Sequence, residues 1–179
     1  MKTRVIERAR RLELVAMRHG PAEARDPARW PRDDRRPLTA KGADQTRRAA
    51  QGIATLVPEV ALVATSAAVR ARRTAEILRA VYPAPPALEV WEELGAGRLA
   101  GPVLDRLAAD APTGATVVVV GHDPTLAELA GLALAGEGIP IVEFSKAGAA
   151  LFEFPRAVRP GAARLRWALT RRQLSAVRG

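Results

Sequence analysis

Both histidines of the chain follow an apolar run that ends beside a glycine. His19 follows residues 12–17 and Arg18 and directly precedes Gly20, and His122 follows residues 117–121. Apolar, β-branched runs of this length that lead into a glycine turn are typical of buried strands, and α/β proteins place their chemistry at the ends of such strands. A single histidine is more often a surface or half-buried residue. Two in matching positions favour a functional site.

The composition fits one domain over residues 1–179, because a chain with 48% hydrophobic residues can bury an ordinary core. It contains no cysteine, which excludes disulfides, thiolate catalysis and cysteine-bound zinc, and two histidines argue against a histidine-rich metal site. Its apolar stretches are shorter than a membrane span, its charged N-terminus differs from a signal peptide, and no nucleotide-binding glycine motif occurs. We therefore expect a cytoplasmic protein without metal, cofactor or membrane contact.

The formal charge of +9 raises nucleic acid as a partner, since clustered basic residues neutralise phosphates. The arginines are instead spread along the chain, and few aromatic side chains lie between them to stack on bases. We interpret the charge as a solvated, arginine-rich surface rather than a nucleic-acid site. Such a surface would still attract a phosphorylated partner over long range.

Strand and helix patterns alternate along the chain. We expect strands over residues 12–17, 62–65, 88–91, 116–120, 149–154 and 164–170, and helices over residues 40–56, 68–81, 103–110 and 124–134. Residues 1–11 fit a basic arm or short helix, and residues 21–37 a proline-rich loop. The pattern predicts an α/β three-layer sandwich, with a mostly parallel central sheet flanked by helices and a hairpin formed by the last two strands.

The residues around His19 are suited to phosphoryl transfer. The imidazole offers a nucleophilic nitrogen, Arg18 an adjacent fixed cation, and Gly20 a backbone that a bulky anion can approach. A phosphoryl group in transfer spreads negative charge over three oxygens, so catalysis is mainly positioning and electrostatics. Arg70, in the first turn of a helix just past a strand end, and His122 could complete the set; the alternative for Arg70 is an exposed helix arginine.

Four further polar residues have simpler interpretations. Ser66 has no nearby base, which favours a turn or phosphate-contact residue over a nucleophile. Asp123 fits the start of a helix, where capping and the helix dipole explain a carboxylate. Asp33 and Asp34 resemble a metal site only weakly, because no other ligand accompanies them.

Four segments in order carry a resemblance to a known family. They are Arg18-His19-Gly20; Arg36-Pro37-Leu38-Thr39 with Lys41-Gly42 and Gln45; Thr65-Ser66 with Arg70-Ala71, Thr74-Ala75 and Glu76-Ile77-Leu78; and Gly121-His122. Together they resemble the histidine phosphatase superfamily, whose fold is phosphoglycerate mutase-like. The short length, residues 22–23 and the ending over residues 165–174 are similar to its SixA-like phosphohistidine phosphatase branch. Ala67 and Arg73 stand where the family commonly has Pro and often has Gln.

The resemblance implies a role for each matching residue. His19 would be the nucleophile that becomes phosphorylated, and Arg18, Arg70 and His122 would hold the phosphoryl oxygens, with Gly20 and Ser66 as further phosphate-binding positions. Glu93 matches the family's proton donor in a loop that continues through Gly95, Gly97 and Gly101, and Glu92 is second choice. The alternative that both glutamates are solvated loop carboxylates stays open.

The sequence thus predicts a phosphatase that works through a phosphohistidine intermediate, with phosphohistidine on a protein as the favoured substrate. A small-molecule phosphomonoesterase or phosphoglycerate mutase is the alternative within enzymes, although a mutase needs extra segments over its site that this chain has little room for. A different class of explanation is an inactive phosphate- or nucleic-acid-binding module. The presence of all four core residues argues against it.

Overall fold

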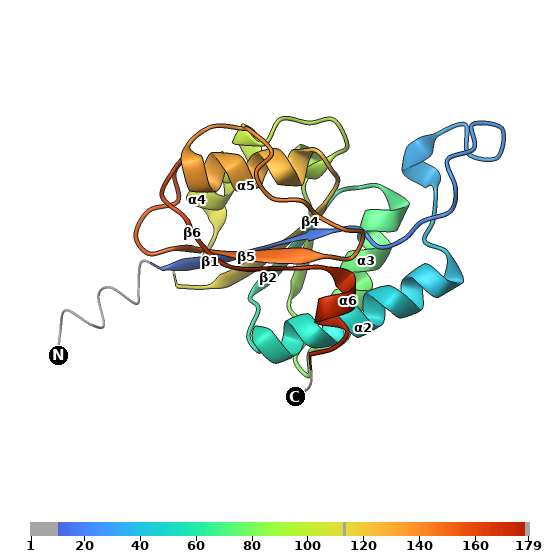
Figure 1. Ribbon diagram of the computed structural model, residues 1–179, viewed down its shortest axis with the longest axis horizontal. Helices are drawn as coiled ribbons and strands as arrows, with labels where there is room; N and C mark the ends of the chain where they lie inside the picture. Colours follow the sequence, from blue (N-terminus) through green and yellow to red (C-terminus); the bar gives the residue numbers. More distant parts are fainter. Residues whose placement is uncertain (1–10, 113, 178–179) are drawn as a thin grey trace.

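The computed structural model describes residues 11–112 and 114–177 and consists of a central sheet between two layers of helices (Figure 1). Its elements are β1 (Leu12–Arg18), η1 (Asp33–Arg35), α2 (Ala40–Leu56), β2 (Leu62–Thr65), α3 (Val69–Arg79), β3 (Ala87–Val90), η2 (Glu92–Leu94), α4 (Gly101–Asp110), β4 (Thr116–Gly121), α5 (Thr125–Ala135), β5 (Ala149–Phe154), β6 (Arg164–Leu169) and α6 (Arg171–Leu174). The expected basic arm falls on residues 1–10, outside the described residues, and on Arg11. In the described part, no helix is long and apolar enough to cross a membrane.

The sheet has the strand order β3-β2-β4-β1-β5-β6. Strands β3, β2, β4 and β1 run parallel, while β5 is antiparallel to both β1 and β6. The mostly parallel sheet and the terminal hairpin are thus confirmed. Because β1 and β4 are central neighbours, the apolar runs before the two histidines lie side by side in register, with Arg18 opposite Gly121.

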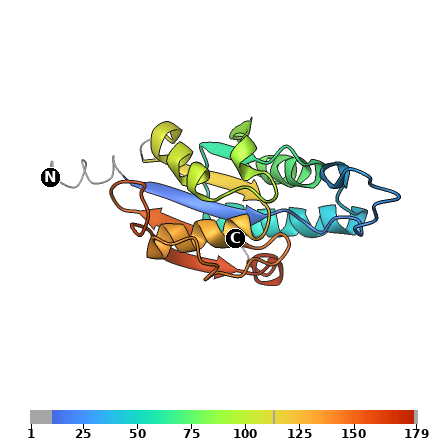
Figure 2. The same cartoon turned by 90° about the horizontal axis from the view of Figure 1, so that it is seen from above.

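Helices cover both faces of the sheet, as the side-on and top views show (Figures 1 and 2), and each face has its own core. Helices α4 and α5 cover one face, where Leu14, Phe152 and Leu104 belong to one buried cluster. Helices α2, α3 and α6 cover the other, where Val15 and Ile53 belong to the second. Alternate residues of β1 therefore point into different cores, as the period of a strand requires. This double burial explains why β1 and β4 are apolar without alternation.

Local signals position the start of α2 and the loop before it. Thr39 caps the helix as expected, since its hydroxyl accepts a hydrogen bond from the amide of Gly42 at 2.8 Å. An antiparallel bridge between Ala22 and Leu38 closes the base of the proline-rich loop over residues 21–37. The loop is irregular as expected, apart from the single turn η1.

Several boundaries differ from the expected ones, by one or two residues. Strands β1 and β4 each continue one residue further, since Arg18 and Gly121 still pair across the sheet. Helix α3 is shorter than the expected 68–81, because Ala68 is extended and the chain turns after Ala80. Helix α4 begins at Gly101, two residues early, with a proline in its first turn.

The remaining differences have local causes too. β3 starts and ends one residue earlier than expected, and Trp91 is fully buried at the start of η2. Pro124 precedes α5 as its N-cap rather than lying in its first turn. β6 stops at Leu169 because Thr170 caps α6, a short helix that the sequence pattern did not indicate.

Candidate active site

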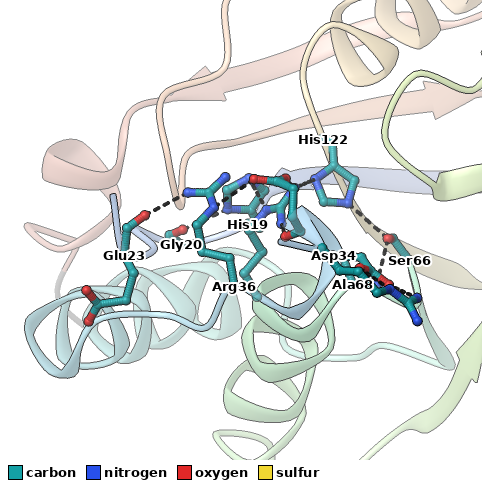
Figure 3. Close-up of polar contacts among 11 residues, drawn as sticks. His19, Gly20, Glu23, Asp34, Arg36, Ser66, Ala68 and His122 are labelled. Carbon is teal, nitrogen blue, oxygen red and sulfur yellow. Dashed lines mark hydrogen bonds and ion pairs between the residues drawn. The ribbon is translucent and has the colours of Figure 1, made fainter. Parts of the chain in front are cut away.

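The two histidines and Ser66 lie together at the carboxyl ends of three neighbouring parallel strands. His19 follows β1, Ser66 follows β2 and His122 follows β4. Backbone hydrogen bonds carry the sheet register past the strand ends, because His19 N–H donates to Gly121 and Ser66 N–H donates to Val120, each at 3.1 Å. The three side chains are buried and point toward a common region of the loop edge (Figure 3).

Arg70 from the first turn of α3 joins the two imidazoles. The ring centres of His19 and His122 are 5.1 Å apart. Arg70 Nε donates to His19 Nε2 at 3.2 Å, and its Nη2 lies 3.4 Å from His122 Nδ1. The structure therefore brings Arg70 into the site, with only 4% of the residue exposed, rather than leaving it on the helix surface.

The hydrogen bonds assign one tautomer to each ring. His19 Nδ1 lies 2.8 Å from the carbonyl oxygen of Gly20, so this nitrogen carries the proton and Nε2 keeps its lone pair. His122 Nδ1 faces Arg70, which can only donate, so His122 Nε2 carries the proton and donates to Ser66 Oγ at 2.9 Å. Nε2 of His19 is thus free to act as a nucleophile.

Both imidazoles are held neutral. Burial lowers the pKa of His19 from 6.5 to about 3, against the raising effect of its hydrogen bond to Gly20, and the charges of Arg70 and Arg18 lower it further. Burial also lowers the pKa of His122, from 6.5 to about 4, with the charge of Arg70 as the next cause. Near neutral pH the nucleophilic nitrogen therefore needs no deprotonation.

Asp33 engages the remaining donors of Arg70. Arg70 Nη1 donates to the Asp33 backbone carbonyl at 2.7 Å, and Arg70 Nη2 lies 3.0 Å from the Asp33 carboxylate. Arg36 Nε donates to the same carboxylate at 3.0 Å, and Arg36 Nη1 to the carbonyl of Glu23 at 2.7 Å (Figure 3). Burial raises the pKa of Asp33, but the hydrogen bond from Arg36 and the charge of Arg70 outweigh it and lower the pKa overall. The resting site therefore holds an ionised carboxylate against its main cation.

Arg18 lies at the end of β1 with one buried donor unused. Its Nη1 donates to the carbonyl of Phe144 at 2.7 Å and lies 3.3 Å from the carboxylate of Asp123. Its Nε is buried and has no acceptor among the described residues. An unpaired buried N–H is costly, and an oxyanion bound beside it would satisfy it.

Gly20 and Ser66 make protein contacts in this structure. The amide of Gly20 donates to Thr74 Oγ1 at 2.9 Å, and a Cβ at this position would overlap the Thr46 hydroxyl. Ser66 Oγ accepts from His122 and from the amide of Ala68 at 3.2 Å. Ser66 thereby fixes the orientation of His122, and Gly20 allows α2 to approach the end of β1.

The structure does not bring Glu93 to the histidines through any contact of the described residues. Its carboxylate accepts two hydrogen bonds from Arg106 of α4, at 3.1 and 3.3 Å. The neighbouring Leu94 packs near Gly121, which places η2 at the rim of the site. Glu92 is exposed.

The comparisons with known proteins agree with this arrangement. Residues 14–107 match the family model described as the histidine phosphatase superfamily, branch 1. The chain belongs to the histidine phosphatase superfamily. An uncharacterized protein from a Picosynechococcus species is 36% identical over 155 residues, covering 86% of this chain and 88% of that protein.

Two solved structures resemble this superfamily member over most of its length. The protein histidine phosphatase SixA in complex with tungstate has a TM-score of 0.77 and 27% identity, with coverage of 90% of this chain and 99% of that one. A candidate phosphohistidine phosphatase SixA from Nakamurella multipartitia has a TM-score of 0.73 and 25% identity, with coverage of 89% and 95%. The SixA-like resemblance and the fold are thereby confirmed, and the chain is a phosphatase of this superfamily.

Several residues of this histidine phosphatase site were not recognised in the sequence. Asp33 and Asp34 suggested only a weak metal site, yet Asp33 contacts Arg70. In the described residues, no three His, Cys, Asp or Glu side chains are grouped to hold a metal ion. Asp123 was interpreted as a helix cap, but the structure shows no side-chain cap on α5, and Asp123 pairs with Arg18 instead. The spacing of Asp33 and Arg36, three positions apart, is the sequence signal that could have indicated that Asp33 pairs with arginines.

We predict that stability falls with acid through the two histidines. Both have folded pKa values below 6.5, so the unfolded chain takes up protons that the folded chain does not, and stability is lost as pH falls below 6.5 toward 4. Between pH 6.5 and 5 the free energy of unfolding should drop by about 2 kcal/mol for each histidine. Urea unfolding at several pH values measures this.

The chain has only these two histidines, which provides a clean control for that measurement. A double variant, His19→Gln with His122→Gln, contains no imidazole, so its stability should be nearly flat between pH 7 and 5. An equal slope in the double variant and the wild type would show that other groups cause the dependence.

We also predict that Asp33→Asn tightens the binding of a simple oxyanion such as sulfate, because the Asp33 carboxylate competes for Arg70. The expected gain is about fivefold or more at low ionic strength, measured by isothermal titration calorimetry. Asp34→Asn is the matched control, because it removes the same charge from a residue that pairs with the exposed Arg32. Weaker sulfate binding in Asp33→Asn would mean instead that Asp33 positions Arg70 and does not compete.

Proposed function

We propose that this protein removes phosphate from phosphohistidine on proteins, through a covalent phosphohistidine at His19. The observation that carries the proposal is the unprotonated Nε2 of a neutral His19, which accepts a hydrogen bond only from Arg70 among the described residues and lies beside His122. A nucleophile of this kind works at neutral pH without a base to activate it.

In the first step, His19 Nε2 attacks phosphorus in line with the bond to the leaving group. The new bond is P–Nε2, the bond that breaks is the one between phosphorus and the substrate nitrogen or oxygen, and the leaving group departs with that electron pair. Arg70 exchanges its hydrogen bonds to His19 and Asp33 for phosphoryl oxygens, and Arg18 offers its unused Nε. These charges stabilise the equatorial oxygens in the transition state.

In the second step, water attacks the phosphorus, the P–Nε2 bond breaks and neutral His19 is restored. The products are inorganic phosphate and one proton that passes to solvent. His19 Nδ1 keeps its proton, hydrogen-bonded to the Gly20 carbonyl, in both steps. Nε2 is therefore again unprotonated for the next cycle. No metal or cofactor takes part in this scheme.

Two observations favour a phosphohistidine substrate over an alkyl phosphate. The likeness to SixA structures extends over most of the chain. Glu93, the first candidate for the family's proton donor, is held by Arg106. A leaving imidazole can be protonated by solvent on its far ring nitrogen, so a phosphoramidate needs less from an acid than an alkoxide does. Small phosphomonoesters remain the second candidate.

We predict that His19→Ala lowers the turnover of both a phosphohistidine protein and para-nitrophenyl phosphate by about 1000-fold or more, since the covalent step is lost. Intact-mass analysis after rapid acid-free quenching should show one added phosphoryl group on the wild type and none on the variant. Circular dichroism controls for folding. Activity that survives in His19→Ala would exclude this mechanism and favour an inactive binding module that carries a contaminant.

A separate prediction concerns Glu93 as proton donor. If Glu93 leaves Arg106 and protonates the leaving oxygen, Glu93→Gln should slow hydrolysis of an alkyl phosphate by about 100-fold, with a much smaller loss on phosphohistidine. Steady-state kinetics with both substrates measures the difference, and Glu92→Gln, at an exposed neighbouring position, is the control. Unchanged alkyl phosphate turnover in Glu93→Gln would remove Glu93 from the mechanism.

A further inference from the structure

A groove lies on the protein surface beside the active site, between η1, the start of α2 and the first turns of α3. Its main hollow measures about 740 Å³. A second hollow of about 330 Å³ continues it between α2 and α3, and the two share Arg73 and Glu76 as lining residues. The groove therefore extends along α3 from its first turn to Val81.

The groove is lined by chain neighbours of the active-site residues. Asp34 and Val69, which line it, are the chain neighbours of Asp33 and Arg70. Leu38 forms part of its wall and packs against Gly20, the residue after His19. A ligand held in the groove would thus lie near the backbone that follows the nucleophile.

The lining combines an apolar floor with uncompensated positive charge. The apolar lining residues of its main hollow are Pro37, Leu38, Ala40, Ala43, Ala67 and Val69. Both carboxylates have partners, because Asp34 pairs with Arg32 and Glu76 pairs with Arg73. Arg35 and Arg72 make no ion pair with any described residue, and both are exposed at the end nearest the active site.

The length of the groove fits a polypeptide better than a small molecule. From Val69 to Arg79, α3 has 11 residues, which corresponds to about 16 Å of helix. An extended segment of about five residues has the same length. A groove of this length, with a cationic end and an apolar floor, is complementary to a short segment that carries a carboxylate and an apolar side chain.

We propose that this groove docks the segment of the phosphorylated protein that flanks its phosphohistidine, with an acidic side chain between Arg35 and Arg72 and an apolar side chain on the floor beside Val69. The inference rests on the proposed function and adds a sequence preference to it. The two arginines favour a substrate with an acidic residue next to its phosphohistidine. The apolar lining favours an apolar residue further along the same segment.

The test measures binding and does not depend on turnover. Two fluorescent peptides carry a non-hydrolysable phosphotriazole in place of phosphohistidine, one with glutamate and leucine in the flank and one with glutamine and leucine. We expect the glutamate peptide to bind wild type about tenfold more tightly by fluorescence polarisation, and Arg35→Gln with Arg72→Gln to abolish that preference. Val69→Ser should weaken both peptides.

Arg156→Gln with Arg159→Gln removes the same charge from the loop between β5 and β6, where both arginines are exposed, and should leave the preference intact. Equal affinity of wild type for the two peptides, or an unchanged preference in the Arg35 and Arg72 variant, would overturn the proposal. Turnover of a phosphohistidine protein is followed in parallel. Its absence in wild type would contradict the proposed function, whatever the peptides show, and an unchanged kcat in the groove variant would place the effect in docking.

Discussion

The guanidinium of Arg70 connects the parts of this site. Its Nε contacts His19 and its Nη2 contacts His122. The guanidinium also binds the loop residue Asp33, through Nη1 to the backbone carbonyl and through Nη2 to the carboxylate. A cation buried to this degree needs anions or acceptors on every donor. Without substrate the protein supplies these acceptors itself. In the proposed reaction, phosphoryl oxygens would replace several of them. The resting contacts of Arg70 thus outline the place where a substrate anion would lie.

This arrangement depends on the parallel pairing of β1, β4 and β2. Their carboxyl ends bring His19, His122 and Ser66 to one edge although they are far apart in sequence. The close approach of α2 at Gly20 and the capping of α2 by Thr39 then fix the loop that carries Asp33. Burial by these elements also removes water from the imidazoles, which lowers their pKa values. The same packing that folds the chain therefore keeps His19, the proposed nucleophile, neutral.

Much of this was accessible from sequence because it depends on local pattern. The apolar runs before His19 and His122 predicted two buried strands with a histidine at the end of each, and the parallel pairing of neighbouring β1 and β4 brings the two histidines together. Arg70 was predictable from its place after the end of β2. The partners of charged side chains were not, because they depend on loop paths and on which helix crosses which strand. Asp33 suggests only a weak metal site in the sequence, because nothing local indicates that its loop brings it to Arg70 of α3.

The partners of Asp123 and Glu93 were likewise not predictable from the local sequence. Asp123 precedes a helix, so capping explained it locally, but the neighbouring strand offered Arg18 as a stronger electrostatic partner. Glu93 lies in a segment that matches a family pattern, yet Arg106 from α4 competes for its carboxylate. Because both pairs are partly exposed, with side chains about 26 to 30% accessible, each holds its partners by a modest energy. A dianionic substrate at Arg18 would compete with Asp123 for its guanidinium, and the release of Glu93 would require both hydrogen bonds from Arg106 to break. The site thus combines a buried centre around Arg70 with partly exposed ion pairs at its rim, and we expect its selectivity to depend on that rim.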